Sequence, residues 1–214
     1  MADDKLYQAK DTKSRMGIMG GSFDPIHNGH LKIAEVSKNK FDLEKVIFVP
    51  AYCPPHKSRP VLAPFEHRSA MIRMAIEGRC FFEVSEIERK ECCPSYAGNT
   101  VKELKGIYGA ECHYYFITGL DALLTLTNWE KSRTYPGLCY FIATTRPGFN
   151  RTAIEREIPN GFLPYIIVNE MPALSVSSTD IRHRIRTNQS LEGLVPEKVQ
   201  NYIYDHNIYI NCFT

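Results

Sequence analysis

The stretch Gly17-Ile18-Met19-Gly20-Gly21-Ser22-Phe23-Asp24-Pro25-Ile26-His27-Asn28-Gly29-His30 decides the fold of this chain. A short apolar run leads into two glycines, and two histidines three residues apart follow. Apolar residues then recur at helical spacing, which predicts a strand, a tight turn and a helix beginning near Asn28. Glycines let backbone N–H groups approach a ligand, and a helix N-terminus favours an anion. With two imidazoles in its first turn, the stretch indicates a site for a phosphate chain.

Neither of two common phosphate-binding patterns, G-x-x-x-x-G-K-[ST] and G-x-G-x-x-G, occurs in this stretch. GGSFDPIHNGH instead resembles the G-G-[ST]-F-D-P-x-H-x-G-H motif of the nicotinate mononucleotide adenylyltransferases, which belong to the nucleotidyltransferase superfamily. Its ending, HNGH, resembles the histidine-glycine-histidine element that this superfamily shares with class I aminoacyl-tRNA synthetases.

Length and composition fit one domain, because the chain has 214 residues and 43% of them are hydrophobic. Residues 1–14 are polar and predict an N-terminal tail that is not a secretory signal, which leaves residues 15–214 as the nucleotidyltransferase domain. A net charge of +2 gives no reason to expect a nucleic-acid or anionic membrane partner. No apolar run reaches the ~20 residues that a membrane helix needs.

Cysteine usage favours a cytoplasmic enzyme with reduced thiols, because the seven cysteines are odd in number and lack a framework spacing. Cys92-Cys93 and Cys112-His113 do not show the C-x₂-C spacing of structural zinc sites. We therefore expect no metal site built from protein side chains.

Short apolar runs alternate with helical patterns along the chain. After the first strand, further strands are expected at 46–49, 81–84, 113–118, 138–143 and 165–168. Helices are expected from about 28 to 40, 66 to 78, Asn99 or Thr100 to 108, 120 to 126, 177 to 186, and Pro196 to 209. This alternation predicts an α/β fold, a Rossmann-like doubly wound parallel sheet with helices on both faces.

Two further features belong at the carboxyl edge of such a sheet, where ligands bind. Lys57 lies in a proline-rich loop after the second strand, from which it can point over the first turn. The segment Ser177–Arg182 places hydroxyl groups at a helix start, any of which can cap it, and an arginine one turn later. That combination suits a second anion.

The resemblance to the family extends from Met16 to about Ile210. Its other motifs are Pro54-Pro55-His56-Lys57, the segment Ser95–Thr100 (similar to S-Y-T-x-D-T), a G-x-D…W pattern from Gly119 to Trp129, the S-S-T-x-I-R pattern at Ser177–Arg182, and a V-P-x-x-V-x-x-Y-I ending from Val195. The family holds the carboxylate of the pyridine ring at S-Y-T-x-D-T, where this chain departs from the pattern at residues 97–99.

The resemblance implies adenylyl transfer in NAD biosynthesis. The phosphate of nicotinate mononucleotide attacks the α-phosphate of ATP and expels pyrophosphate, giving nicotinate adenine dinucleotide. A phosphate nucleophile is already ionised at neutral pH, so neither a general base nor a protein nucleophile is needed. Catalysis would rest on positioning and on neutralising charge as it moves onto pyrophosphate. Mg²⁺ would travel with ATP, because few carboxylates are available to cage it.

The resemblance also implies individual roles. Catalytic contacts to the triphosphate would come from His27, His30, Lys57 and Arg182. ATP and dinucleotide binding would involve Gly20, Gly21, Ser22, Phe23, Gly119, Asp121, Ser178 and Thr179. The pyridine nucleotide would meet Ser95, Tyr96, Ala97, Trp129 and Arg146.

Several alternatives stay open at this point. The substrate could be nicotinamide mononucleotide, or both mononucleotides. Phosphopantetheine adenylyltransferases share the first motif but lack the later ones, and a nucleotide-binding regulator without turnover would not need the contacts to a leaving group. Whether the chain forms a homo-oligomer is also open.

Overall fold

The structure is a computed structural model that describes residues 13–53, 63–90, 96–127, 137–145, 156–171 and 176–210. Its strands are β1 (Arg15–Gly21), β2 (Lys45–Pro50), β3 (Phe82–Val84), β4 (His113–Gly119), β5 (Tyr140–Thr145) and β6 (Ile166–Glu170). Its helices are α2 (Asn28–Lys40), α3 (Phe65–Ile76), α4 (Ala97–Tyr108), α5 (Leu120–Thr127), α7 (Ser178–Arg186) and α8 (Glu197–Asp205). Two short 3-10 helices, η1 (Ile87–Lys90) and η3 (Leu163–Tyr165), complete the described elements.

β1 lies inside the sheet because it pairs with β2 on one side and with β4 on the other. The strand order is β3-β2-β1-β4-β5-β6, and all the pairs are parallel. This confirms the predicted doubly wound α/β sheet. In this order the winding of the chain reverses between β1 and β4, and such a switch point is where open α/β sheets bind ligands at their carboxyl edge.

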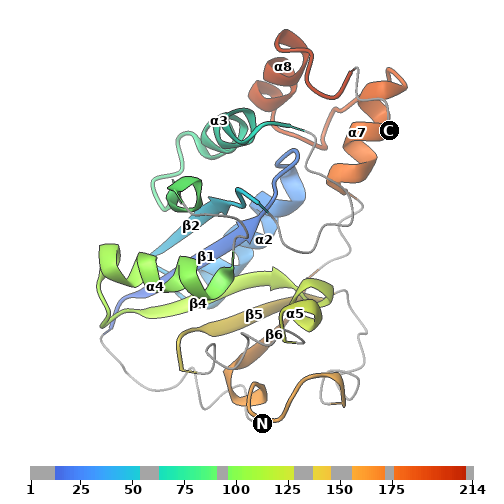
Figure 1. The fold of residues 1–214 in the computed structure, drawn as a ribbon. Helices are drawn as coiled ribbons and strands as arrows, with labels where there is room; N and C mark the ends of the chain where they lie inside the picture. Colours follow the sequence, from blue (N-terminus) through green and yellow to red (C-terminus); the bar gives the residue numbers. More distant parts are fainter. Residues whose placement is uncertain are drawn as a thin grey trace.

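Each face of the sheet has its own hydrophobic core, because successive strand residues point to opposite faces. Met19 on β1 belongs to the core that α2, α3, α7 and α8 cover. Its neighbour Ile18 belongs to the core that α4 and α5 cover. Figure 1 shows α4 and α5 in front of the sheet and α2 behind it. The two cores pack against β1 from both faces and so position Gly20 and Gly21 at its end.

Two predicted helix boundaries were wrong, each for a physical reason. α4 begins at Ala97 with Tyr96 as its N-cap, not at Asn99 or Thr100, because the backbone N–H groups of both residues donate to the backbone oxygen of Tyr96, at 2.9 and 3.3 Å. α8 ends at Asp205 rather than near Tyr209. The chain reverses after it with Asn207 at φ 53° and Tyr209 at φ 69°, values in the left-handed region that an α-helix does not use.

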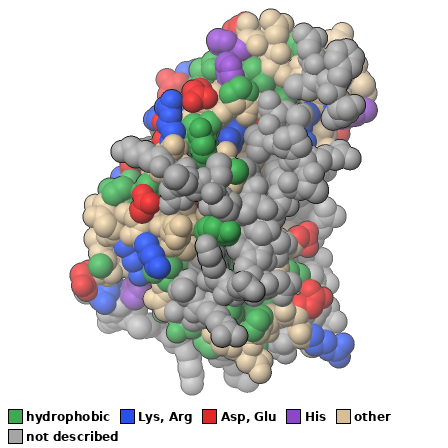
Figure 2. All heavy atoms as spheres, in the orientation of Figure 1, with side chains coloured by type: hydrophobic (Ala, Val, Ile, Leu, Met, Phe, Trp, Pro, Cys, Tyr) green, Lys and Arg blue, Asp and Glu red, His purple; other side chains and the backbone are tan. Residues whose placement is uncertain are grey.

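The described surface and helices add two observations. On the face drawn in Figure 2, basic and acidic side chains of the described residues are interspersed rather than gathered into one patch. Among the described residues no helix has the length and apolar character needed to cross a membrane. Residues 1–12, which make up most of the predicted tail, lie outside the described ranges.

Candidate active site

The candidate site lies at the switch point, where β1 ends in Gly20-Gly21 and β4 ends at Gly119. α2 begins seven residues after Gly21, and α5 begins directly after Gly119. A side chain on Gly20 would not fit, since its Cβ would lie 2.7 Å from Cζ of Phe116 on the neighbouring strand. The end of β1 therefore carries no side chain at this position.

His27 and His30 cap the start of α2 reciprocally. His27 is the N-cap, and its Nδ1 accepts a hydrogen bond from the backbone N–H of His30 at 3.3 Å. The backbone N–H of His27 in turn donates to Nδ1 of His30, also at 3.3 Å. The two rings stack with their centroids 3.7 Å apart. The spacing of three residues thus builds a capping box in which imidazoles replace the usual hydroxyl and carboxylate groups.

The His27 ring is neutral in the folded protein. Its side chain is buried, and burial lowers the pKa of His27 to about 4. A hydrogen bond with its own backbone opposes this decrease only in part. His27 can therefore offer a hydrogen-bond donor to a phosphate, but it brings no positive charge at neutral pH.

Gly29 separates the two histidines because the His27 ring occupies the space where a side chain would lie. A Cβ at this position would be 2.9 Å from Nδ1 of His27 and 2.9 Å from Cγ1 of Val176. The geometry of the cap thus explains the H-x-G-H spacing of residues 27–30.

Phe23 packs against the ring of His30. Its backbone adopts φ 47°, and its side chain is only 2% exposed. The ring meets His30 edge-on at a centroid distance of 5.1 Å and packs against Phe48 at 5.8 Å. Its side chain is thus part of the core beneath the site, and only its backbone remains available to line a ligand.

α7 brings a cationic side chain to the first motif. Ser177 is the N-cap, its Oγ accepting from the N–H of Asp180 at 3.1 Å. Arg182 donates from Nη1 to the backbone oxygen of Asp24 at 2.6 Å and from Nη2 to Thr179 Oγ1 at 3.3 Å. Ser178 Oγ donates to the backbone oxygen of Pro25 at 2.9 Å. The fold thereby joins two motifs that lie more than 150 residues apart.

The other predicted site residues occupy element ends or lie outside the described ranges. Tyr96 is the N-cap of α4 without a side-chain capping bond, and Ala97 is the first helical residue. Asp121 is exposed in the first turn of α5. Lys57, Ser95, Trp129 and Arg146 fall outside the residues that the structure describes.

Sequence reasoning assigned no role to Asp24 and missed Arg68 and Tyr209. Asp24 Oδ1 accepts from Tyr209 Oη at 2.9 Å. Arg68, itself buried, donates from Nη1 to the backbone oxygen of Ser22 at 2.7 Å. One signal was available for Arg68: it lies on the apolar face of its helix, where an arginine needs a buried partner. No local pattern marks Tyr209.

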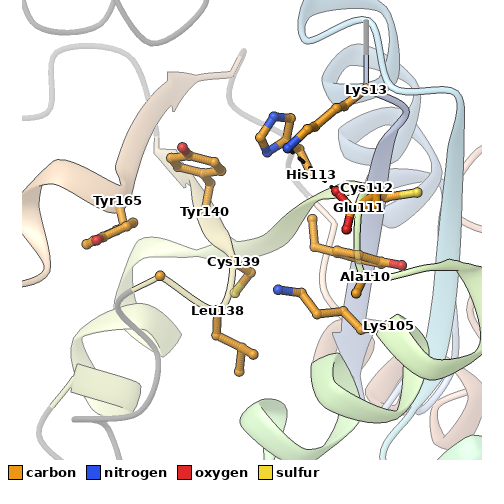
Figure 3. Close-up of a pocket in the computed structure, with 12 residues that line it drawn as sticks. Lys13, Lys105, Ala110, Glu111, Cys112, His113, Leu138, Cys139, Tyr140 and Tyr165 are labelled. Atoms are coloured by element: carbon orange, nitrogen blue, oxygen red, sulfur yellow. Dashed lines mark ion pairs between the residues drawn. The ribbon is translucent and has the colours of Figure 1, made fainter. Parts of the chain in front are cut away.

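A pocket of about 250 Å³ lies at the opposite edge of the sheet, where β4 and β5 begin. Figure 3 shows Lys105 reaching it from α4, with Tyr140 and Tyr165 on the other side. It is therefore separate from the candidate site. Within the described ranges, no three His, Cys, Asp or Glu side chains form a group that could hold a metal ion.

Comparisons with known proteins identify relatives of this chain. The cytidylyltransferase-like family matches residues 18–184. A probable nicotinate-nucleotide adenylyltransferase of Moorella thermoacetica is 44% identical over 200 residues, which cover 91% of each chain. The chain belongs to the nicotinate-nucleotide adenylyltransferase family. A second such relative, from Thermoanaerobacter sp., is 42% identical over 91% of this chain and 94% of its own length.

Solved structures confirm the fold expected for this family. Plasmodium falciparum nicotinic acid mononucleotide adenylyltransferase, solved in complex with NaAD, superposes with a TM-score of 0.71 over 92% of this chain and 97% of its own. At 22% identity this likeness concerns the fold alone. The family resemblance of GGSFDPIHNGH is confirmed, and the chain is a nucleotidyltransferase of this family.

Proposed function

We propose that this protein transfers the adenylyl group of ATP to nicotinate mononucleotide, forming nicotinate adenine dinucleotide and pyrophosphate. The observation that carries the proposal is a contact between two helix starts: Arg182 of α7 donates to the backbone oxygen of Asp24 in the motif loop (Ser22–His27), which leads into α2. A triphosphate laid across both would meet the imidazole N–H groups of His27 and His30 and the guanidinium of Arg182.

The reaction needs no protein nucleophile. A phosphate oxygen of nicotinate mononucleotide forms a bond to the α-phosphorus of ATP, while the bond from that phosphorus to the bridging oxygen of pyrophosphate breaks. Negative charge moves onto the departing pyrophosphate. We assign His30 to the α-phosphate, and Arg182 and Lys57 to the departing phosphates, where donors stabilise that charge. Both substrates carry phosphate groups, so fixed hydrogen-bond donors can align them. This alignment contributes further to the rate enhancement.

Mg²⁺ enters as part of the ATP substrate. Its preferred ligands are oxygens, including those of substrate phosphates. Asp24 is the one carboxylate on the motif loop, and hydrogen bonds to protein donors already engage it. We therefore assign no protein side chain as a metal ligand. We also place the reaction in the cytoplasm, a setting that suits the free thiols of Cys80, Cys112 and Cys139.

The preference for the acid over the amide follows from the start of α4. A helix leaves its first N–H groups without intrahelical partners, and Ala97 and Gly98 place small residues there. Such donors favour a carboxylate through charge-assisted hydrogen bonds and the helix dipole. A carboxamide would set its own NH₂ donors against them.

The test is a coupled assay of the purified protein with MgATP and nicotinate mononucleotide. Pyrophosphate release should match the formation of nicotinate adenine dinucleotide, measured by chromatography, mole for mole. ATP binding without either product would make the protein a nucleotide-binding regulator and would refute the proposal.

A further inference from the structure

The Asp24 carboxylate is the centre of a buried polar network behind the candidate site. Its side chain is 2% exposed. Oδ1 accepts hydrogen bonds from Tyr209 Oη at 2.9 Å and from the backbone N–H of Ala63 at 3.1 Å. Oδ2 lies 3.7 Å from Nη1 of Arg182, the same nitrogen that donates to the backbone oxygen of Asp24. One residue of the motif loop thus contacts three distant segments.

A second guanidinium, that of Arg68, also bonds to the motif loop. Arg68 donates from Nη1 to the backbone oxygen of Ser22 at 2.7 Å and from Nε to that of Ala63 at 3.0 Å. Burial lowers the pKa of Arg68, while the negative charge of Asp24 opposes that decrease. The buried carboxylate is therefore balanced by two arginines, as a charge in a protein interior requires.

Tyr209 closes this network from the carboxyl-terminal segment. Its ring is 2% exposed, and its hydroxyl reaches a residue 185 positions earlier in the chain. Burial raises the pKa of Tyr209, and the nearby Asp24 carboxylate raises it further, so the hydroxyl stays protonated and donates. Its contribution is consequently a hydrogen bond to a charged acceptor, among the stronger kinds in proteins.

We infer that Asp24 and Tyr209 are positioning residues for adenylyl transfer, a role that rests on the proposed function. Neither residue is assigned a contact with substrate. Tyr209 orients the Asp24 carboxylate, and Asp24 orients the guanidinium of Arg182. Arg182 has five N–H donors, and within the described part of the chain its contacts with Asp24 and Thr179 engage two of its nitrogens. The remaining donors are then turned toward the triphosphate in a fixed direction.

The hydrogen bond from Ala63 connects a further segment of the chain to the Asp24 carboxylate. Ala63 is the first described residue after positions 54–62, the stretch that carries Lys57. Because Asp24 Oδ1 and Arg68 Nε both bond to the backbone of Ala63, the segment that leads into α3 is anchored to the motif loop. One carboxylate thereby links α2, α7 and the start of α3.

The test is a double-mutant cycle between Tyr209→Phe and Arg182→Ala, read as the Kd of MgATP by calorimetry and as the KM for ATP. Tyr209→Phe keeps the buried ring and removes only the hydroxyl. We expect it to weaken MgATP binding and to raise the KM about tenfold, the order of one hydrogen bond to a charged group. In the Arg182→Ala background it should change neither value, since the residue through which it acts is gone.

Tyr204→Phe is the matched control, because Tyr204 is 38% exposed on α8 and loses the same hydroxyl. It should leave Kd and KM unchanged. Asp24→Asn is the second variant. Its effect on the Kd of MgATP and on the KM for ATP should also disappear in the Arg182→Ala background. Equal effects of Tyr209→Phe with and without Arg182 would overturn the inference and leave Tyr209 a structural residue. Turnover of the wild type is measured separately. Absence of turnover would refute the proposed function, whereas the coupling between Tyr209 and Arg182 is tested by MgATP binding alone.

Discussion

His27 and His30 each accept, through Nδ1, a hydrogen bond from the backbone N–H of the other at 3.3 Å. A neutral imidazole that accepts at Nδ1 carries its proton on Nε2. The cap that starts α2 therefore also selects the tautomer of both rings. The capping bonds and the proposed phosphate contacts use different nitrogens, so substitution can separate the two roles.

Replacing His30 by glutamine tests the catalytic contact without removing the cap. Glutamine is a natural partner at this position of a capping box, so His30→Gln should keep the melting temperature of the wild type. It lacks the imidazole N–H, and kcat should fall about 10²-fold, as for the loss of one donor to a developing charge. His30→Ala should lower both the melting temperature and kcat. Wild-type kcat in His30→Gln would reduce His30 to a structural role.

The buried His27 ring predicts a specific pH dependence of stability. The unfolded chain takes up a proton on His27 near pH 6.5, whereas the folded protein does so only near its lowered pKa of about 4. Protonation therefore favours unfolding, and the stability that is complete above pH 6.5 is lost as the pH falls from 6.5 toward 4. The full loss is about 3 kcal/mol.

Chemical denaturation between pH 7 and 5 measures this loss, with His27→Asn as the comparison. Asparagine is a good N-cap and does not titrate. The free energy of unfolding of the wild type should fall with decreasing pH more steeply than that of the variant. Parallel curves for the two proteins would show that His27 is not held neutral by burial.

Gly29→Ala should impair the protein although alanine is the better helix former. The new Cβ would lie 2.9 Å from Nδ1 of His27 and from Cγ1 of Val176, so the capping ring must move. We expect a lower melting temperature and a lower kcat. Gly106→Ala is the control: it lies within α4 with open space around it and should gain up to about 1 kcal/mol. A neutral or stabilising Gly29→Ala would contradict the packing described for this cap.

The sheet and the motif loop could be predicted because local patterns encode them. Continuous apolar runs marked the strands. The two glycines, predicted as a tight turn, are instead the last residues of β1. Ser177 was one of three predicted caps and is the one observed. Arg68 and Tyr209 could not be placed in this way, because their partners are 46 and 185 positions away and depend on how α3 and α8 pack. The roles of all the predicted site residues stay predictions, and Lys57, Ser95, Trp129 and Arg146 also lie outside the described residues.

Removing residues 1–12 should leave the melting temperature and kcat unchanged. These residues are rich in charge and carry little apolar surface to bury. The backbone pairing described next to them begins at Ser14, whose oxygen accepts from the N–H of His113 at 2.9 Å. Thermal unfolding and the turnover assay, each on the full and the shortened chain, decide the matter. A loss of several degrees would mean that the tail docks on the domain.

The most direct measurement of the central claim is kcat/KM for nicotinate mononucleotide and for nicotinamide mononucleotide, each with MgATP. We expect adenylyl transfer to both, with the acid preferred by about 10²-fold or more, because a carboxamide mispairs its donors with the N–H groups that begin α4. Equal values would contradict the proposed preference and make the protein a dual-specificity enzyme, and no transfer to either would contradict the proposed reaction itself.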